Sequence, residues 1–327
     1  MRKVVARPTG PNQLPKGNKS MAGVDLAYIA LATREVARLS KLLGEDLGLP
    51  SHEVLLPDGA KQPAFAIGQS ALVVVEAGHP FLSTPHTGVD HIAFVSDNPT
   101  SEVANLNLPI KPCDNQGFNG NSQVCVDTPA VCGVELRFTK SLGLTSPSVQ
   151  HIDRIDHIGI ESSDNITAED VFVRQIGCTY ESRQTDMEVS QAIESFTSDK
   201  YGAIYHSRPP KPVGGLKVSF ITVGDCELEF LQNFDPAQGF DIKHGTPGDT
   251  KQDQSAIGRY IEKRGAGLHH IALKCHDIDA LLPRLAEAGH RMIDLKGRPG
   301  SRRALIGFMH PASLGGVLLH FVERQEL

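Results

Sequence analysis

Residues 265–273 read GAGLHHIAL, a short apolar run that looks like a buried strand and carries two adjacent histidines. Successive side chains of a β-strand point to opposite faces of the sheet. Strict alternation therefore predicts that His269 and His270 face opposite ways, so that one meets chemistry while the other fills core or surface. Which one does so depends on the pattern around them.

The segment opens a strand–helix–strand pattern that occurs twice in this half of the chain. Residues 278–289 predict the clearest helix, with leucines on one face and Gly289 at its end. The strands with it are predicted at 269–275, 304–310 and 316–323. Before them come a strand at 154–162, a helix near 167–176, strands at 217–224 and 227–232, and a short helix in SAIGRYIEKRG. We interpret each set as a βαβββ unit.

The N-terminal half resembles the C-terminal half segment by segment. The matching pieces are VDLAYIAL with RIDHIGIE, QPAFAIGQSALVVVEAG with LKVSFITVGDCELEFLQ, GVDHIAFVSD with GLHHIALKCHD, and CGVELRF with GGVLLHF. Internal repetition of this kind indicates tandem structural modules. We predict an α+β fold of four βαβββ modules: a flexible N-terminal arm at 1–21, one module pair at 22–142 and a second at 152–325.

Composition narrows the classes of function. The chain has 327 residues and a formal charge of −6, so no broad basic field exists to bind nucleic acid. No apolar run approaches the roughly 20 residues that cross a bilayer. The first 21 residues lack the apolar core of a signal peptide, and six scattered cysteines without a CxxC pair favour reduced thiols. We expect a cytoplasmic protein whose partner is a small molecule, with a homodimer as an open alternative.

The pattern resembles the vicinal oxygen chelate superfamily, which includes glyoxalase I, the extradiol dioxygenases and methylmalonyl-CoA epimerase. The similarity to the epimerases is strongest in SAIGRYIEKRGAGLHHIAL, DIDALLPRLAEAG and HPASLGGVLL. The resemblance implies two domains of paired modules, each a cupped mixed β-sheet. It also implies one divalent metal ion, held by residues from the first and last strands of two modules.

Carried over residue by residue, the resemblance places metal ligands at His157, Glu229, His270 and His320. The last departs from the family, which has a glutamate there that also serves as an acid or base. These polar side chains lie in apolar strands, where burial costs several kcal/mol without a partner. Imidazole with carboxylate suits zinc, iron, cobalt, nickel or manganese. His270 is thus the predicted ligand, and His269 is predicted to point away from the site.

The N-terminal half supplies an internal control. By alignment of the repeats, its corresponding positions are Leu26, Val73, His91 and Arg137. Leucine, valine and a permanently charged arginine cannot form a cation site. This half is therefore predicted to have the architecture without the metal.

Two other segments are candidates for contact with a substrate. The basic stretch KGRPGSRR offers Arg298, Arg302 and Arg303 as binders of carboxylate or phosphate, with an ordinary solvated loop as the alternative. The connector at 192–216 is longer than the epimerase pattern needs and is a candidate lid.

The resemblance implies a metal-dependent isomerase or lyase that abstracts a proton next to a carbonyl of a small acid or acyl-CoA-type substrate. Glu229 and His320 are the candidate catalytic residues, and Glu229 is either a ligand or a free base. Two alternatives stay open. One is a non-haem iron dioxygenase of the extradiol or hydroxyphenylpyruvate type, and the other is a non-catalytic small-molecule binding protein.

Overall fold

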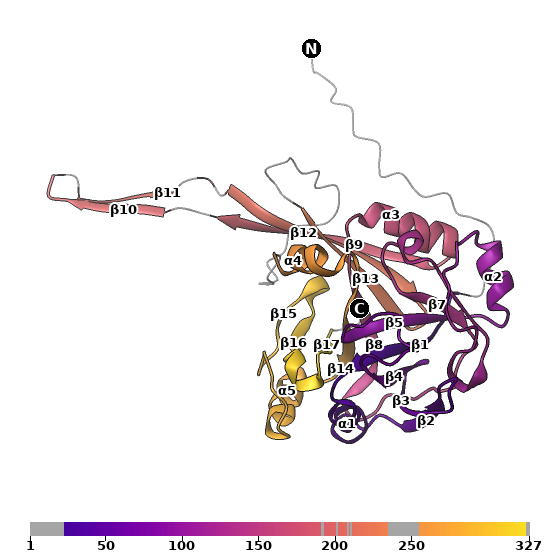
Figure 1. The fold of residues 1–327 in the computed structure, drawn as a ribbon. Coiled ribbons are helices and arrows are strands. Elements are labelled where there is room, and N and C mark those ends of the chain that lie inside the picture. Colours follow the sequence, from indigo (N-terminus) through magenta and orange to yellow (C-terminus); the bar gives the residue numbers. More distant parts are fainter. Residues whose placement is uncertain are drawn as a thin grey trace, which may run out of the picture.

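Two mixed β-sheets make up most of the structure, a computed structural model that describes residues 23–190, 193–200, 202–207, 209, 211–234 and 255–324 (Figure 1). The seven-stranded sheet runs in the order β2-β3-β4-β1-β5-β7-β6 and the eight-stranded sheet in the order β15-β16-β17-β14-β8-β13-β12-β9. The first sheet consists of β1 (Leu26–Thr33), β2 (Ser51–Leu55), β3 (Lys61–Ile67), β4 (Ser70–Glu76), β5 (Gly88–Val95), β6 (Gln123–Cys125) and β7 (Leu136–Thr139). The second consists of β8 (Ile152–Glu161), β9 (Thr179–Ser190), β12 (Lys211–Val223), β13 (Cys226–Phe234), β14 (Gly267–Cys275), β15 (Arg298–Pro299), β16 (Leu305–Phe308) and β17 (Leu319–Glu323).

The strand pairing repeats four times. The first strand of each module pairs in parallel with its last strand: β1 with β4, β5 with β7, β8 with β13, and β14 with β17. The first strands of neighbouring modules then pair antiparallel, β1 with β5 and β8 with β14. Parallel pairs require a crossover connection, which the helix of each module provides. The predicted α+β fold with paired modules and mixed sheets is confirmed.

The described helices are short. They are α1 (Val36–Lys41), α2 (Pro99–Asn105), α3 (Asn165–Glu169), α4 (Ser255–Arg264) and α5 (Ile278–Glu287). All but α4, which lies between β13 and β14, are in the module crossovers. Helices α1 and α3 continue as wider π-helical turns over Leu42–Asp46 and Asp170–Ile176. In α5 the predicted apolar face is buried, with Leu281 and Leu282 fully inaccessible. Gly289 then adopts a positive φ of 90° that ends the helix region.

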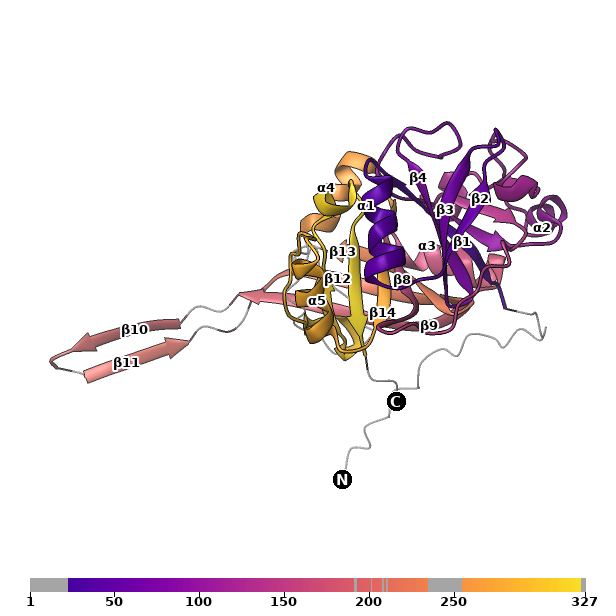
Figure 2. The same ribbon diagram turned by 90° about the horizontal axis from the view of Figure 1, so that it is seen from below.

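The two sheets share one apolar core. The largest buried cluster includes Leu31 and Phe94 from the first sheet together with Ile158 and Phe321 from the second. Helix α1 lies close to the elements of the C-terminal half in both views (Figures 1 and 2). Between the halves, His290 Nε2 lies 2.7 Å from Asp46 Oδ2. The first half therefore packs against the second and is held to it by polar contacts at the edge.

The candidate lid has a different structure from the one predicted. Strands β10 (Ile193–Ser198) and β11 (Gly202–Ser207) pair antiparallel and extend away from the two sheets as an arm (Figures 1 and 2). The described part of this connector therefore does not form a lid. The predicted N-terminal arm at 1–21 lies outside the described residues.

The cysteines correct a second expectation. Cys113 and Cys125 form a disulfide, whereas Cys132, Cys178, Cys226 and Cys275 are free. The expectation of reduced thiols is therefore wrong for this pair. A separation of 12 residues does not by itself predict a disulfide. The two cysteines come together because the loop after α2 folds against β6.

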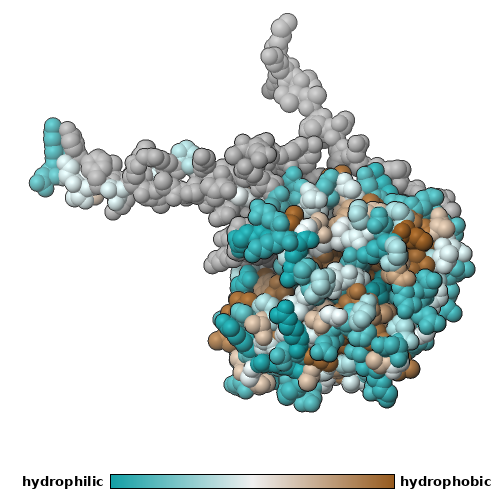
Figure 3. All heavy atoms as spheres, viewed as in Figure 1, coloured by the Kyte–Doolittle hydropathy of each residue, from teal (hydrophilic) through white to brown (hydrophobic). Residues whose placement is uncertain are grey.

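Hydrophilic residues cover most of the described face shown in Figure 3, and apolar residues form separate patches among them. The larger exposed apolar side chains come from several elements: Leu55, Ile110, Ile166, Ile293, Leu295 and Leu305. Scattered apolar residues of this kind are ordinary at a protein surface. Within the described residues, every helix is too short or too polar to cross a membrane.

Candidate metal centre

Four adjacent strands bring the predicted ligands together. The order β17-β14-β8-β13 places His320, His270, His157 and Glu229 on neighbouring strands of the second sheet. In the register, Ala272 of β14 lies opposite both His157 and His320. Gly159 of β8 lies opposite both His270 and Glu229. The repeat thus places the four side chains around one point, although they are up to 163 residues apart in sequence.

The three histidines form a compact donor set. One ring nitrogen from each of His157, His270 and His320 lies within 4.8 Å of the other two. Glu229 Oε2 lies 3.1 Å from His157 Nε2 and 3.7 Å from His270 Nε2. All four residues are buried, with at most 5% of each exposed. Glu229 thus contacts two of the histidines but is outside the mutually close set, and three imidazoles at this spacing fit a divalent transition metal such as zinc.

Buried polar atoms in this set lack hydrogen bonds. His157 Nε2 and His320 Nδ1 are both inaccessible and have no hydrogen-bond partner within the described part of the chain. The 3.1 Å contact between His157 and Glu229 does not meet hydrogen-bond geometry. A buried polar atom without a partner is costly, and coordination to a cation would satisfy these atoms.

Gly159 makes the space that the site needs. A Cβ at this position would lie 1.9 Å from Cε1 of His270. Any larger residue would push the His270 ring out of its place beside Glu229. The φ of Gly159 is not in the left-handed region, so the backbone conformation does not require glycine here. The residue is needed because only glycine leaves room for the His270 ring.

Asp156 fixes the orientation of His157. Its Oδ1 lies 2.7 Å from His157 Nδ1, and the Arg324 guanidinium donates to the same oxygen at 2.5 Å. This contact leaves Nε2 of His157 facing the site. A carboxylate behind a ligating histidine is a common arrangement that fixes the ring and raises its basicity.

Electrostatics within the set are strongly coupled. Burial alone would disfavour a charged imidazole at His157, but Glu229 and Asp156 outweigh it and raise the pKa to about 9. Burial likewise opposes charge on Glu229, yet the attraction of His157 lowers the pKa of this carboxyl to about 2. Burial and the neighbouring charges hold the pKa of His270 and His320 well below the usual value. The neutral imidazoles of His270 and His320 and the ionised carboxylate of Glu229 are the forms that bind a metal, whereas His157 must lose its proton to do so.

The histidines border a cavity of about 310 Å³. Its apolar walls come from Leu231, Ile257, Ile293, Ala304, Ile306, Phe308, Leu318 and Val322. Its other polar lining consists of Glu161, His269, Arg298, Ser301 and Arg324. A mostly apolar cavity with a few charged groups around a donor set is typical of a small-molecule site.

Only one of the three predicted arginines lines this cavity. Arg298 does so, and its guanidinium lies 5.2 Å from the ring centre of Phe308. Arg302 instead forms ion pairs with Glu181 and Glu227 and lies over the Phe220 ring. Arg303 is exposed and outside the lining. Arg324, which sequence reasoning missed, supplies a second cavity arginine from the end of β17.

Strict alternation gave the wrong position for His269. Leu268 pairs with Ile160 and His270 with Gly159, so His269 forms a β-bulge. Its Nδ1 lies 3.1 Å from His270 Nδ1, and both rings line the cavity. A bulge re-aims side chains in this way and is frequent near active sites.

A β-bulge of this kind occurs in the first strand of all four modules, directly before the residue that corresponds to His270. The unpaired residues are Ala27, Asp90, Asp156 and His269, and they directly precede Tyr28, His91, His157 and His270. The sequence gives no signal for these bulges beyond the polar residue at three of the four places. They explain how Asp156 reaches the ring of the very next residue.

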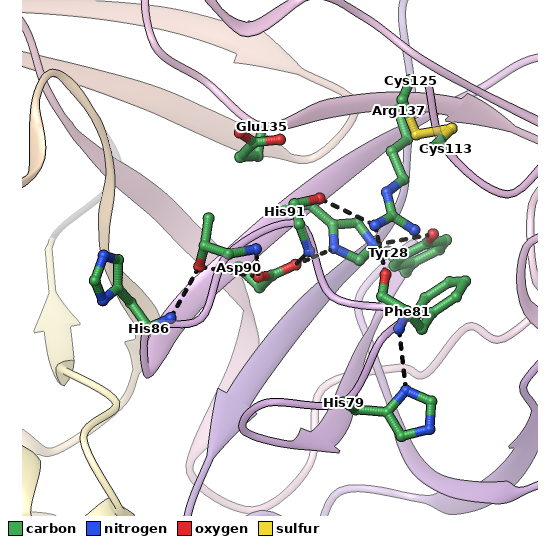
Figure 4. A network of polar contacts seen from close by, with 12 residues as sticks. Tyr28, His79, Phe81, His86, Asp90, His91, Cys113, Cys125, Glu135 and Arg137 are labelled. Carbon is green, nitrogen blue, oxygen red and sulfur yellow. Dashed lines mark hydrogen bonds and ion pairs between the residues drawn. A yellow bond between two sulfur atoms is a disulfide. The ribbon is translucent and has the colours of Figure 1, made fainter. Parts of the chain in front are cut away.

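The register also corrects the N-terminal control. In the second sheet, His157 lies opposite Ala272. The residue of the first sheet that corresponds to Ala272 is Ala93, and it lies opposite Tyr28, so Tyr28 rather than Leu26 corresponds to His157. The corresponding set is thus Tyr28, Val73, His91 and Arg137. Figure 4 shows the resulting network, in which Tyr28 Oη lies 3.3 Å from His91 Nε2 and Asp90 contacts His91 Nδ1 at 2.6 Å.

Comparison with known proteins agrees with the fold. The family described as the Glyoxalase/Bleomycin resistance protein/Dioxygenase superfamily matches residues 156–308. The ethylmalonyl-CoA/methylmalonyl-CoA epimerase of Cereibacter sphaeroides is 31% identical over 121 residues, or 36% of this chain and 77% of that protein. The mitochondrial methylmalonyl-CoA epimerase of Bos taurus is 26% identical over 135 residues, or 41% of this chain. The match spans 66% of the bovine protein, slightly less than two thirds of its length.

A solved structure matches almost the whole chain. A mutant of 4-hydroxymandelate synthase from Streptomyces coelicolor aligns over 93% of this chain and 94% of its own, with a TM-score of 0.53 and 14% identity. At this identity the likeness concerns the fold alone. Fold and site together define a paired-module protein with a buried donor set. The chain belongs to the Glyoxalase/Bleomycin resistance protein/Dioxygenase superfamily.

Proposed function

We propose that this protein is a metal-dependent isomerase or lyase that moves a proton at a carbon next to a carbonyl group. The observation that carries the proposal is the triad of His157, His270 and His320 on the wall of a mostly apolar cavity. These three residues would hold one divalent cation, with Glu229 as the fourth group. Such a cation supplies electrostatic stabilisation of negative charge that develops on a carbonyl oxygen.

The cavity favours a substrate with an acidic group and a short apolar body. Arg298 and Arg324 line it, and although their guanidinium groups contact Asp294 and Asp156, each has further N–H groups of the kind that bind a carboxylate well. The apolar walls exclude water and suit a short carbon chain. The epimerase relatives support an acyl-CoA-type substrate whose acyl part enters the cavity.

Deuterium exchange tests this proposal directly. Metal-free protein is loaded separately with zinc, cobalt, nickel, manganese or iron(II) and incubated in deuterated buffer without oxygen. The substrates are methylmalonyl-CoA and a series of small 2-oxo acids, and proton NMR follows loss of the hydrogen next to the carbonyl. We expect metal-dependent exchange for at least one substrate. No exchange across this panel with any metal contradicts the proposal.

The same metal-loaded proteins, assayed with and without oxygen, distinguish the two alternative functions. Turnover that occurs only with iron(II) and oxygen would favour the dioxygenase, although three histidines with a glutamate depart from its usual two histidines and one carboxylate. Protein that retains no stoichiometric metal yet binds a small molecule would favour sequestration.

Assigning Glu229 and His320 to the metal leaves a specific gap. These two residues were the catalytic candidates, and a histidine stands where the family has its glutamate. A proton acceptor must lie within hydrogen-bond reach of the reacting carbon. Neither residue is free for that role when both face the cation.

A further inference from the structure

Glu161 is a buried carboxylate in the cavity that the ligand set does not use. It lies at the end of β8, on the same face as His157 by two-residue alternation, and it is fully inaccessible. Both of its carboxylate oxygens lack a hydrogen bond to any described residue. Burial of a carboxylate is costly unless a partner or a function compensates. Because Glu161 lines the cavity, we interpret its burial as a sign of function.

The β-bulge joins Glu161 to the metal centre. His269 Nδ1 lies 2.8 Å from Glu161 Oε1 and 3.1 Å from His270 Nδ1. A single imidazole nitrogen therefore separates Glu161 from a member of the histidine triad. The His269 ring is held in turn by Tyr260, whose ring centre lies 4.7 Å away. Tyr260 itself donates a hydrogen bond to the carbonyl of Leu268.

The remaining acidic groups near the cavity are engaged. Among the lining residues that the structure describes, only Glu161 and Glu229 carry a carboxylate. Glu229 lies against His157 and His270. Asp156 stands behind His157 and accepts from Arg324. Glu161 is therefore the acidic side chain of the described lining that does not contact the histidine triad, and its ion-pair contact is with His269.

We propose that Glu161 is the catalytic residue that accepts the proton from the substrate carbon and returns it. The step breaks the C–H bond, and its electron pair forms the carbon–carbon double bond of an enolate while the carbonyl oxygen becomes negative. Glu161 holds the proton until it returns to the carbon, so atoms and charge balance over the cycle. The inference rests on the proposed function and supplies the base that the replacement of the family's glutamate by His320 removes.

The test compares Glu161→Gln with the wild type and with Glu135→Gln. Glutamine keeps the shape of the side chain but cannot accept the proton. Glu135 is a matched control because its carboxylate accepts from Lys111 and Thr128 in the N-terminal half. Three quantities are measured: the deuterium-exchange rate of methylmalonyl-CoA and the 2-oxo acids, bound zinc per chain after dialysis, and the visible spectrum of the cobalt-loaded protein.

We expect Glu161→Gln to lower the exchange rate at least 100-fold, within the usual contribution of a general base. Its zinc content and cobalt spectrum should equal those of the wild type, and Glu135→Gln should exchange within threefold of it. If Glu161→Gln retains exchange, Glu161 is not the base while the proposed function stands. If it loses zinc or alters the cobalt spectrum, its role is structural and the inference fails. If the wild type exchanges none of these substrates, the proposed function fails and the inference with it.

Discussion

Arg137 and His320 occupy the same position in the two sheets: Arg137 lies opposite Ala93 in β5, and His320 lies opposite the equivalent Ala272 in β14. The Arg137 guanidinium donates to the carbonyl of Phe81 at 2.8 Å and to Ser83 Oγ at 3.0 Å. It also lies 4.6 Å from the centre of the Phe81 ring. Arginine has no lone pair to offer a metal. The N-terminal half thus carries the fixed positive charge of Arg137 at the position where the C-terminal half has the imidazole of His320, which can bind a cation.

The two adjacent histidines of β14 should differ in metal retention. His270→Ala removes a member of the triad, and we expect zinc to be lost on dialysis. His269→Ala removes the contact behind His270 Nδ1 and the contact with Glu161 but no member of the triad, so zinc should stay bound with an affinity about 10-fold weaker. Zinc analysis after dialysis and competition with a chelator measure both effects. Equal loss in the two variants would contradict the assignment of His270 as the ligand.

Asp156→Asn should weaken metal binding without unfolding the site. The substitution removes the charge that orients His157 and leaves Arg324 without its carboxylate partner. Loss of such a supporting group lowers metal affinity about 10- to 100-fold. Chelator competition gives the affinity, and circular dichroism checks the fold. An unchanged affinity would show that Asp156 does not hold the ring.

Gly159→Ala should disrupt the centre through crowding. The added Cβ would meet the His270 ring at 1.9 Å, and overpacking of this kind costs about 1–3 kcal/mol. We expect a lower melting temperature together with loss of zinc. Gly258→Ala in α4 is the matched control, because its nearest neighbour would be Asn233 Nδ2 at 3.5 Å. That variant should melt no lower than the wild type; a similar fall in both would contradict the steric explanation.

His91 should make folding sensitive to acid. Burial lowers its pKa to about 4, and the charge of Arg137 adds to the effect. In the unfolded chain the group has its ordinary value near 6.5. The unfolded state therefore takes up the proton first, so the stability that this group contributes above pH 6.5 is lost as the pH falls toward 4.

Thermal melts of the wild type and of His91→Gln at pH 7 and pH 5 check this sign. We expect the wild type to lose about 2 kcal/mol more than the variant between these two values. The other buried histidines are present in both proteins and cancel in the comparison. Parallel pH dependence of the two proteins would contradict the prediction.

Sequence patterns predicted the architecture well because repetition is a property of the chain itself. The apolar periodicity of α5 and the four matched strand sets specify the modules before any contact is known. The same alignment selected His157, Glu229, His270 and His320, which the structure brings to one cavity. Whether they bind a metal stays a prediction.

The positions of the arginines and of His269 could not be predicted from the sequence. The loop that carries Arg302 and Arg303 is basic in sequence, yet Arg302 pairs with Glu181 and Glu227 from other strands. Those partners come from remote positions, so no local pattern could reveal them. Glu161 is a polar residue of RIDHIGIES on the same face as His157 by alternation, so the sequence does carry a signal for it.

The sequence by itself determined the number of modules, their order and the four polar positions, because hydrophobic periodicity and repetition are local properties. The tertiary structure alone decided the register, and with it the bulges that turn Asp156 and His269 toward their neighbours. A bulge depends on which residue of the partner strand is opposite, so a single chain segment cannot specify it. That register, rather than any motif, places Glu161 one imidazole away from the histidine triad.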